Sequence, residues 1–285
     1  MSIVIIGLSL SFLLFLLAAG LTLIFGMLGV INFAHGALYM LGAYVCYSVG
    51  VATGSFWGGL LVAPLVVAAV GALMETLTLR RVYDRDHIYQ LLLTFGFILV
   101  FDDVTKIVWG LDYKQVPTPE IFSQPIEMFG SLIPSYRVFV ILFGTAVSIG
   151  LFLVLDRSKW GMVIRAASSD SDMAQALGID VSKVRTGVFA LGAGLAAVGG
   201  AITAPLVPIE LGMGFSIIID CFIVVIIGGL GNIRGAILAS LVIGMTRAAG
   251  YAYATEWVEL TTFALLIVTL MFRPAGLFSY KGRSA

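Results

Sequence analysis

Long apolar runs constrain this chain more than any other feature. Several come close to the roughly 20 residues that a helix needs to cross the hydrocarbon core of a bilayer. They are residues 3–25, 56–79, 89–111, 137–155, 186–204 and 256–272. Backbone groups in lipid must be hydrogen-bonded within the protein, which favours helices. Charged residues make up 11% of the chain, against roughly 25% in soluble domains. These features predict an all-α, multi-pass membrane protein.

Three further apolar runs are short or interrupted, namely 36–53, 217–229 and 236–250. The first follows GMLGVINFAHG (26–36), and the other two flank GGLGNIRG (228–235). Short, glycine-interrupted segments in both halves of a membrane chain are typical of discontinuous helices that line a transport pathway. We therefore predict a single transmembrane domain over 1–285, a helix bundle of eight or nine segments. The short runs either re-enter the membrane or span it.

The basic residues predict the orientation of the bundle. Twelve of the 16 Lys and Arg fall in segments that alternation places on one side: Arg80, Arg81, Arg85, Arg157, Lys159, Arg165, Lys183, Arg185, Arg234, Arg273, Lys281 and Arg283. The positive-inside rule makes that side cytoplasmic. The proline-rich loop 112–136 is then extracytoplasmic, and the C-terminus is cytoplasmic.

The longest polar interruption, 156–185, predicts a surface for a cytoplasmic partner. Its side chains Ser169, Asp170 and Ser171 can cap a short helix that begins near Asp172, and Gly178 supplies a left-handed stop. Helical spacing places three apolar residues on one face of this helix: Met173, Ala174 and Leu177. Ser182 can cap the helix that re-enters the membrane. The alternative is a solvated connector, but a structureless loop of this length is unusual, so we favour a docking helix.

A few polar side chains stand at membrane depth. Asn32 and His35 lie beside glycines, and intramembrane polar groups are functional candidates by default. The alternative is that they satisfy backbone groups freed by a helix break, and both interpretations remain open. Asp220 is an isolated acid in 217–229 and a candidate for the pathway. Glu75 stands near the inner end of 56–79, where Arg80 or a partner's basic residue can pair with it.

Small residues repeat every four positions between Leu191 and Ala201, a pattern that lets helices pack closely. The two stripes are Gly192, Ala196 and Gly200, and Ala193, Ala197 and Ala201.

Several function classes are excluded by what the sequence lacks. A net charge of zero gives no reason to expect nucleic-acid binding. The chain contains no G-x-x-x-x-G-K-[ST] phosphate loop, so nucleotide hydrolysis must occur elsewhere. No H-E-x-x-H, G-x-S-x-G or Cys/His cluster supports catalysis or metal binding. We expect no catalytic residues, no metal and no cofactor bound by this chain.

Five ordered segments resemble one known family. They are INFAHGALYMLGAY (31–44), LLLTFG (91–96), RAASSDSDMAQALGI (165–179), GGLGNIRGAILASLVIG (228–244) and RPAGLF (273–278). They look like the permeases of branched-chain amino acid ABC importers, and the NFAHG wording is similar to the LivH-type subunit. The resemblance extends over 18–278, nearly the whole chain.

This resemblance implies an assembly in the bacterial inner membrane. The expected partners are a homologous LivM-like permease, two cytoplasmic ATPases that hold ATP and Mg²⁺, and a periplasmic solute-binding protein. The coupling residues that seat in an ATPase groove would be Arg165, Asp172, Met173, Ala174, Leu177, Gly178 and Ile179. The residues flanking the pathway would be Asn32, Phe33, His35, Gly36, Asp220, Gly228, Gly229 and Gly231.

The substrate stays open at this stage. Relatives of this kind import branched-chain and other apolar amino acids, and also urea, short amides, and aromatic or carboxylic acids. We take an apolar amino acid as the default. The alternative from another class is an ion-coupled secondary transporter with broken helices, which would use Asp220 but would leave the docking helix without a purpose.

Overall fold

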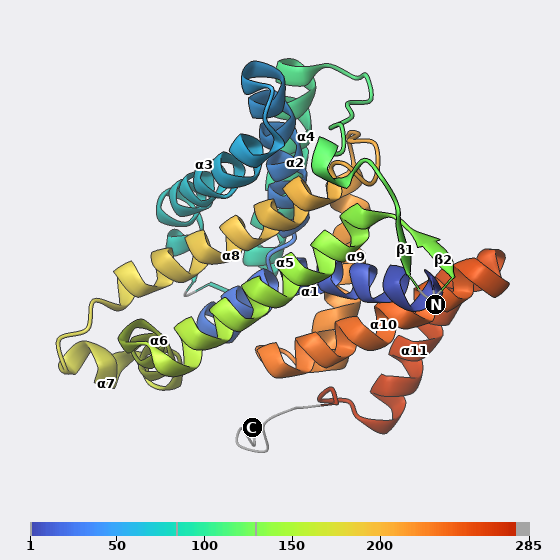
Figure 1. Ribbon diagram of the computed structural model, residues 1–285. Helices are drawn as coiled ribbons and strands as arrows, with labels where there is room; N and C mark the ends of the chain where they lie inside the picture. Colours follow the sequence, from blue (N-terminus) through green and yellow to red (C-terminus); the bar gives the residue numbers. More distant parts are fainter. Residues whose placement is uncertain (1, 84, 129, 278–285) are drawn as a thin grey trace.

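The computed structural model describes residues 2–83, 85–128 and 130–277, and this part of the chain is predominantly helical (Figure 1). Its α-helices are α1 (Ser2–Leu28), α2 (His35–Thr53), α3 (Phe56–Leu77), α4 (His87–Trp109), α5 (Ser135–Phe152), α6 (Lys159–Ser169), α7 (Ser171–Ala176), α8 (Val181–Thr203), α9 (Met213–Gly228), α10 (Ile233–Tyr253) and α11 (Val258–Phe272). The shorter helical turns are η1 (Leu79–Arg81), η2 (Glu120–Phe122), η3 (Leu153–Arg157), in which α5 widens to a π-helix, and η4 (Thr255–Trp257).

Every predicted apolar run lies in a helix, apart from one or two residues at the ends of some runs. Within the described residues, seven helical segments are long and apolar enough to cross a membrane. The expectation that three runs form short helices is wrong for two of them. Helix α2 has 19 residues and adds only His35 to its run. Helix α10 has 21 residues, because it extends by three residues at each end of its run. Only α9, with 16 residues or about 24 Å of rise, stays short.

The centre of the bundle is formed by α1, α2 and α8, which carry most of its fully buried side chains. The small-residue stripes of α8 have the predicted role. A methyl group on Gly200 would strike the backbone of Tyr39, and Ala197 lies against Gly42. Around this centre, α3, α4, α5 and α11 expose large apolar side chains on their outer faces, as a lipid-facing surface requires.

The two ends of the bundle differ in character. At one end, the antiparallel hairpin β1 (Ile126–Met128) and β2 (Ser131–Ile133) lies beside the start of α1 (Figure 1). Two backbone hydrogen bonds join Lys114 and Ile209, which lie in different loops. The Lys114 amide donates to the Ile209 carbonyl at 3.0 Å, and the Ile209 amide donates to the Lys114 carbonyl at 2.8 Å. The predicted loop 112–136 is therefore partly a hairpin, and its last two residues belong to α5, because Pro134 provides the residue before the first turn.

The opposite end is formed by the last turn of α1, the π-helical end of α5, α6, α7, the start of α8 and the turn 229–232. We call it the basic end. It holds Arg80, Arg157, Arg165, Lys183, Arg185 and Arg234. Lys281 and Arg283, which the sequence places on this side, lie outside the described residues.

Candidate functional site

The polar interruption folds into two helices, not one. The first, α6, was not predicted. Ser158 caps it by accepting a hydrogen bond from the Gly161 amide at 3.0 Å. Ile164 and Ala167 are three residues apart and are both buried against the basic end of the bundle. This spacing, together with the serine cap, is the signal in the sequence that would have revealed α6.

The second helix, α7, has the predicted cap and stop. Asp170 accepts hydrogen bonds from the amides of Asp172 and Met173 at 3.1 and 2.9 Å. Since the cap is Asp170, the helix begins at Ser171, one residue earlier than expected. Gly178 has a φ of +85°, and the Ile179 amide donates to the Ala174 carbonyl at 3.0 Å. A left-handed glycine closes the helix in this way.

The apolar residues of α7 do not share one exposed face. Met173 and Leu177 are 57% and 76% exposed, whereas Ala174 is 2% exposed. The prediction is wrong for Ala174 because its small side chain packs into a cluster with Val181 and Val184 of α8. Ala174 therefore anchors α7 to the bundle, while Met173 and Leu177 stay free to contact another surface.

The start of α8 corrects a second expectation. Its cap is Asp180, which accepts a hydrogen bond from the Lys183 amide at 3.2 Å. Ser182 lies inside the first turn and is not the cap, because α8 begins at Val181. The Lys183 ammonium also forms an ion pair with the Asp180 carboxylate at 3.0 Å. These hydrogen bonds to Lys183 lower the pKa of Asp180.

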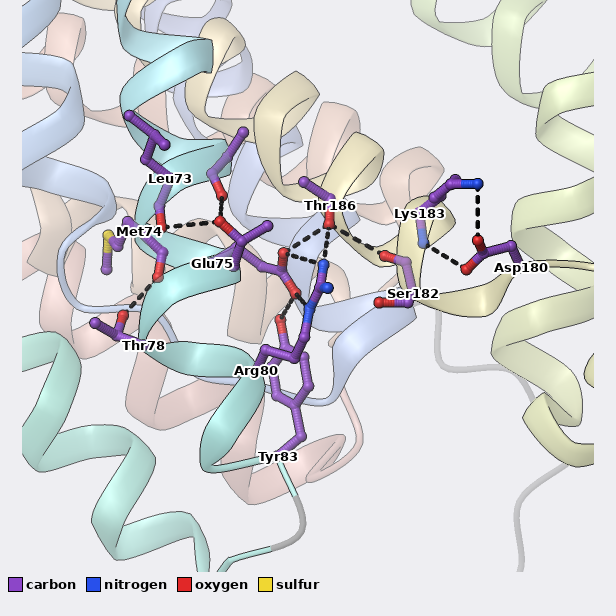
Figure 2. Close-up of polar contacts among 12 residues, drawn as sticks. Leu73, Met74, Glu75, Thr78, Arg80, Tyr83, Asp180, Ser182, Lys183 and Thr186 are labelled. Atoms are coloured by element: carbon purple, nitrogen blue, oxygen red, sulfur yellow. Dashed lines mark hydrogen bonds and ion pairs between the residues drawn. The ribbon is translucent and has the colours of Figure 1, made fainter.

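A buried carboxylate joins α3 to α8 (Figure 2). Glu75 of α3 is 0% exposed, and its Oε2 pairs with Arg80 of η1 at 3.0 Å. Thr186 of α8 donates to Glu75 Oε2 at 2.7 Å, and Tyr83 donates to Oε1 at 3.1 Å. The predicted pairing of Glu75 with Arg80 is confirmed. The contact with Thr186 was missed, since nothing local in the sequence indicates it.

The Tyr83 phenol is part of the same arrangement. Burial raises the pKa of Tyr83, and the negative charge of Glu75 raises it further. The Arg185 guanidinium lies 5.3 Å from the centre of the Tyr83 ring. Helix α3, the loop that follows it and the first turns of α8 are thus held together by hydrogen bonds, an ion pair and a cation–π contact.

The polar residues before α2 are deeply buried. Asn32 and His35 are both 0% exposed. His35 Nε2 donates to the Leu17 carbonyl at 3.0 Å. Leu17 lies inside the continuous helix α1, so this carbonyl is not one that a helix break has freed. The Asn32 amide and His35 Nδ1 have no hydrogen-bond partner in the described part of the chain. Phe33 packs on Phe222 of α9 with ring centres 4.9 Å apart.

Asp220 is not an isolated acid. Both of its oxygens accept hydrogen bonds from Arg247 of α10 at 2.5 Å, and Arg247 Nε lies 3.3 Å from Thr262 of α11. The side chains of Asp220 and Arg247 are 17% and 16% exposed. The prediction failed because the partner lies 27 residues further along, on a different helix.

The predicted pathway glycines are places where backbones touch. A methyl group on Gly36 would overlap the Gly214 carbonyl of α9, and one on Gly228 would overlap Gly235 of α10. Gly229 and Gly231 have φ values of +99° and +79°, which favour glycine. Gly231 also lies against Gly26 at the end of α1. The structure therefore places the glycine turn 229–232 at the basic end, whereas Gly36 and Asp220 lie between packed helices.

The helices, their buried centre and their apolar outer faces define a multi-pass membrane protein. The chain belongs to the permease components of branched-chain amino acid transport systems. That family, described as "Branched-chain amino acid transport system / permease component", matches residues 3–270. Its members are transport permeases and not enzymes.

Two curated relatives have similar length. The chain is 29% identical to the LivH permease protein of the high-affinity branched-chain amino acid transport system of Escherichia coli K12, and 29% identical to BraD of Pseudomonas aeruginosa. Each alignment covers 92% of this chain and 90% of the relative. The E. coli LivM protein is 26% identical, over 92% of this chain and 67% of LivM. No solved structure matches. The expected resemblance to the LivH type is thus confirmed.

Proposed function

We propose that this chain is the permease subunit of an ABC importer that takes up branched-chain or related apolar amino acids. Transport would proceed by alternating access, driven by ATPases in separate subunits. The observation that carries this proposal is α7. Its exposed Met173 and Leu177 point away from the bundle, while its buried Ala174 connects it to α8.

The docking surface would transmit movements of a bound partner to the transmembrane helices. Arg165, Asp172, Met173, Leu177, Gly178 and Ile179 stand on or beside α6 and α7. A partner that binds Leu177 and moves would displace Ala174 as well. Because Ala174 packs against Val181 and Val184, the start of α8 would move with it. From there, the bond between Thr186 and Glu75 extends the link to α3. Residues 156–185 would thus be the coupling segment.

The partners follow from the family and from the chain's own lack of a phosphate loop. We propose two cytoplasmic ATPases that bind ATP and Mg²⁺, a second homologous permease of the LivM type and a periplasmic solute-binding protein. The basic end would face the cytoplasm of a bacterial inner membrane, together with the C-terminus, because basic residues accumulate on that side. The bundle would then have eight or nine crossings, and loop 112–136 would be extracytoplasmic.

The substrate proposal rests on relatives. LivH and BraD are named as permeases of branched-chain amino acid systems. In this chain the pathway would run beside α9, near Asn32, Phe33, His35, Gly36 and Asp220, and would end at the glycine turn of Gly228, Gly229 and Gly231. At Gly36 and Gly228 the backbones of neighbouring helices are in contact.

The test is the substitution Leu177→Asp. It places a charge on the exposed face of α7, where no packing inside the chain is lost. We expect the ATPases to be lost from the purified complex and uptake of labelled leucine to stop, while the chain stays in the membrane. A matched control is Leu111→Asp, since Leu111 is 70% exposed at the opposite end of the bundle.

Normal co-purification and uptake in Leu177→Asp would contradict the docking proposal. The competing class, an ion-coupled secondary transporter, predicts uptake in vesicles that hold an ion gradient but no ATP. The charge of Asp220 is already balanced by Arg247, which leaves this acid less suited to bind a coupling cation. We therefore expect no uptake under those conditions.

A further inference from the structure

A cavity of about 460 Å³ lies at the basic end. It is open on one side, and it is lined by the last turns of α1, the end of α5, α6, and the turn that leads into α10. Pockets that hold small molecules have volumes of roughly 300–1,000 Å³. The cavity is therefore large enough for a compact organic ligand, and its walls come from four separate segments.

One wall of the cavity is apolar. Leu23 and Met27 of α1 face it from one side, Phe152 of α5 from another, and Ile164 of α6 and Ile233 of α10 complete the wall. These are aliphatic or aromatic groups without charge. They suit a hydrocarbon group, whose transfer out of water is favourable.

The rim of the cavity carries an excess of positive charge. Arg165, Arg234 and Asp156 line it. Arg234 pairs with Asp156 at 2.8 Å, and its guanidinium lies 5.0 Å from the Phe152 ring centre. Arg165 donates to the Leu155 carbonyl, and no carboxylate among the described residues forms an ion pair with it. The rim therefore has one guanidinium charge that a carboxylate can balance.

A buried hydroxyl lies beneath the cavity and is not open to it. Thr22 is 0% exposed, and its Oγ1 has no hydrogen-bond partner within the described ranges. Buried polar groups in folded proteins are normally hydrogen-bonded, and an unpaired one is unfavourable. Because Thr22 is fully covered, a ligand in the cavity does not reach this hydroxyl.

We propose that this cavity binds a small carboxylate with an apolar body. The carboxylate would lie between Arg165 and Arg234, and the hydrocarbon part would lie against Leu23 and Ile164. Because α1, α5, α6 and the turn before α10 all contribute walls, an occupant holds them in their present arrangement and slows turnover. This regulatory role rests on the proposed function, whereas the binding does not.

The test uses the full chain in phosphatidylcholine nanodiscs and titrates it with 4-methylpentanoate, which has the carbon skeleton of leucine and a carboxylate. We expect saturable binding of the acid and none of 3-methylbutylamine. Arg165→Gln and Arg234→Gln should each weaken binding about tenfold, the effect of losing a charge-assisted hydrogen bond. Arg81→Gln is the matched control, because this exposed arginine of η1 lies outside the cavity lining.

Absence of saturable binding, equal binding of the amine, or unchanged affinity in both arginine variants would overturn the proposal. Competition by added phosphatidylglycerol would do so as well, because it would assign the rim to a lipid headgroup. If Arg234→Gln does not fold, Arg165→Gln decides the outcome. Leucine uptake by the assembled importer separates the two ideas: uptake without binding refutes the cavity, and binding without uptake refutes the transport function.

Discussion

Thr186 donates a hydrogen bond of 2.7 Å to the buried carboxylate of Glu75, which lies 111 residues earlier in the chain. This bond ties α8 to α3 just beyond the coupling segment (Figure 2). A hydrogen bond to a charged group contributes about 1.5–3 kcal/mol. We therefore expect Thr186→Val to lower the free energy of unfolding by about that amount. Thermal unfolding of the purified chain in detergent measures it.

The same substitution tests the link to transport. If Thr186 transmits motion, Thr186→Val will retain ATPase binding but lower the uptake of leucine per ATP hydrolysed. Thr186→Ser is the matched control, since it keeps the donor. An unchanged ratio of uptake to hydrolysis in Thr186→Val would limit the bond to a structural role.

Tyr83 predicts a dependence on alkaline pH. Burial and the Glu75 charge raise its pKa in the folded state. A raised pKa means that the contribution of the neutral phenol is fully present below the unfolded value of about 10 and is lost as pH rises toward the folded value. We expect the stability difference between the wild type and Tyr83→Phe to shrink above about pH 10. Chemical unfolding at a series of pH values measures it.

A second substitution identifies the charge responsible. Glu75→Gln removes the negative neighbour of Tyr83 and should lower the pKa of the phenol, as followed by the absorbance of tyrosinate. The difference spectrum against the double variant with Tyr83→Phe isolates this one side chain. If Glu75→Gln leaves the titration of Tyr83 unchanged, burial alone accounts for the raised pKa.

Local signals in the sequence predicted much of the fold. Apolar runs located the membrane helices, and the cap and stop of α7 at Asp170 and Gly178 followed from residue type and spacing. Glu75 and Arg80 are five residues apart, so their pairing could be predicted from their spacing in the sequence.

Contacts between segments that are distant in the sequence could not be predicted in this way. The partners of Glu75 and Asp220 on other helices, Thr186 and Arg247, depend on how the bundle packs. The burial of Ala174 does too, because α7 alone is too short to define an inner face without α8. The sequence also predicted Ser182 as a cap where Asp180 serves, since both types of side chain can cap a helix and only the backbone path decides between them.

Two glycines of α2 should respond in opposite directions to alanine. At Gly36 a methyl group would overlap the Gly214 carbonyl, whereas at Gly50 it would meet nothing within 4 Å. Overpacking costs about 1–3 kcal/mol, so Gly36→Ala should lower the melting temperature. Gly50→Ala should raise stability by about 0.5–1 kcal/mol, because alanine favours helix. Equal effects at both positions would argue against the close approach of α2 and α9.

The pair of Asp220 and Arg247 should behave as a unit. Asp220→Asn leaves the Arg247 charge largely buried without a counter-charge, and Arg247→Gln does the reverse. Removing one partner of a buried ion pair lowers the free energy of unfolding by about 3–5 kcal/mol. Both side chains are partly exposed, so we expect a loss at the lower end of that range. In the double variant neither charge is left alone, so we expect the summed losses to exceed the measured loss by at least about 1 kcal/mol. Unfolding of the four proteins in one detergent gives this coupling energy, and strictly additive losses would show that the two charges do not depend on each other.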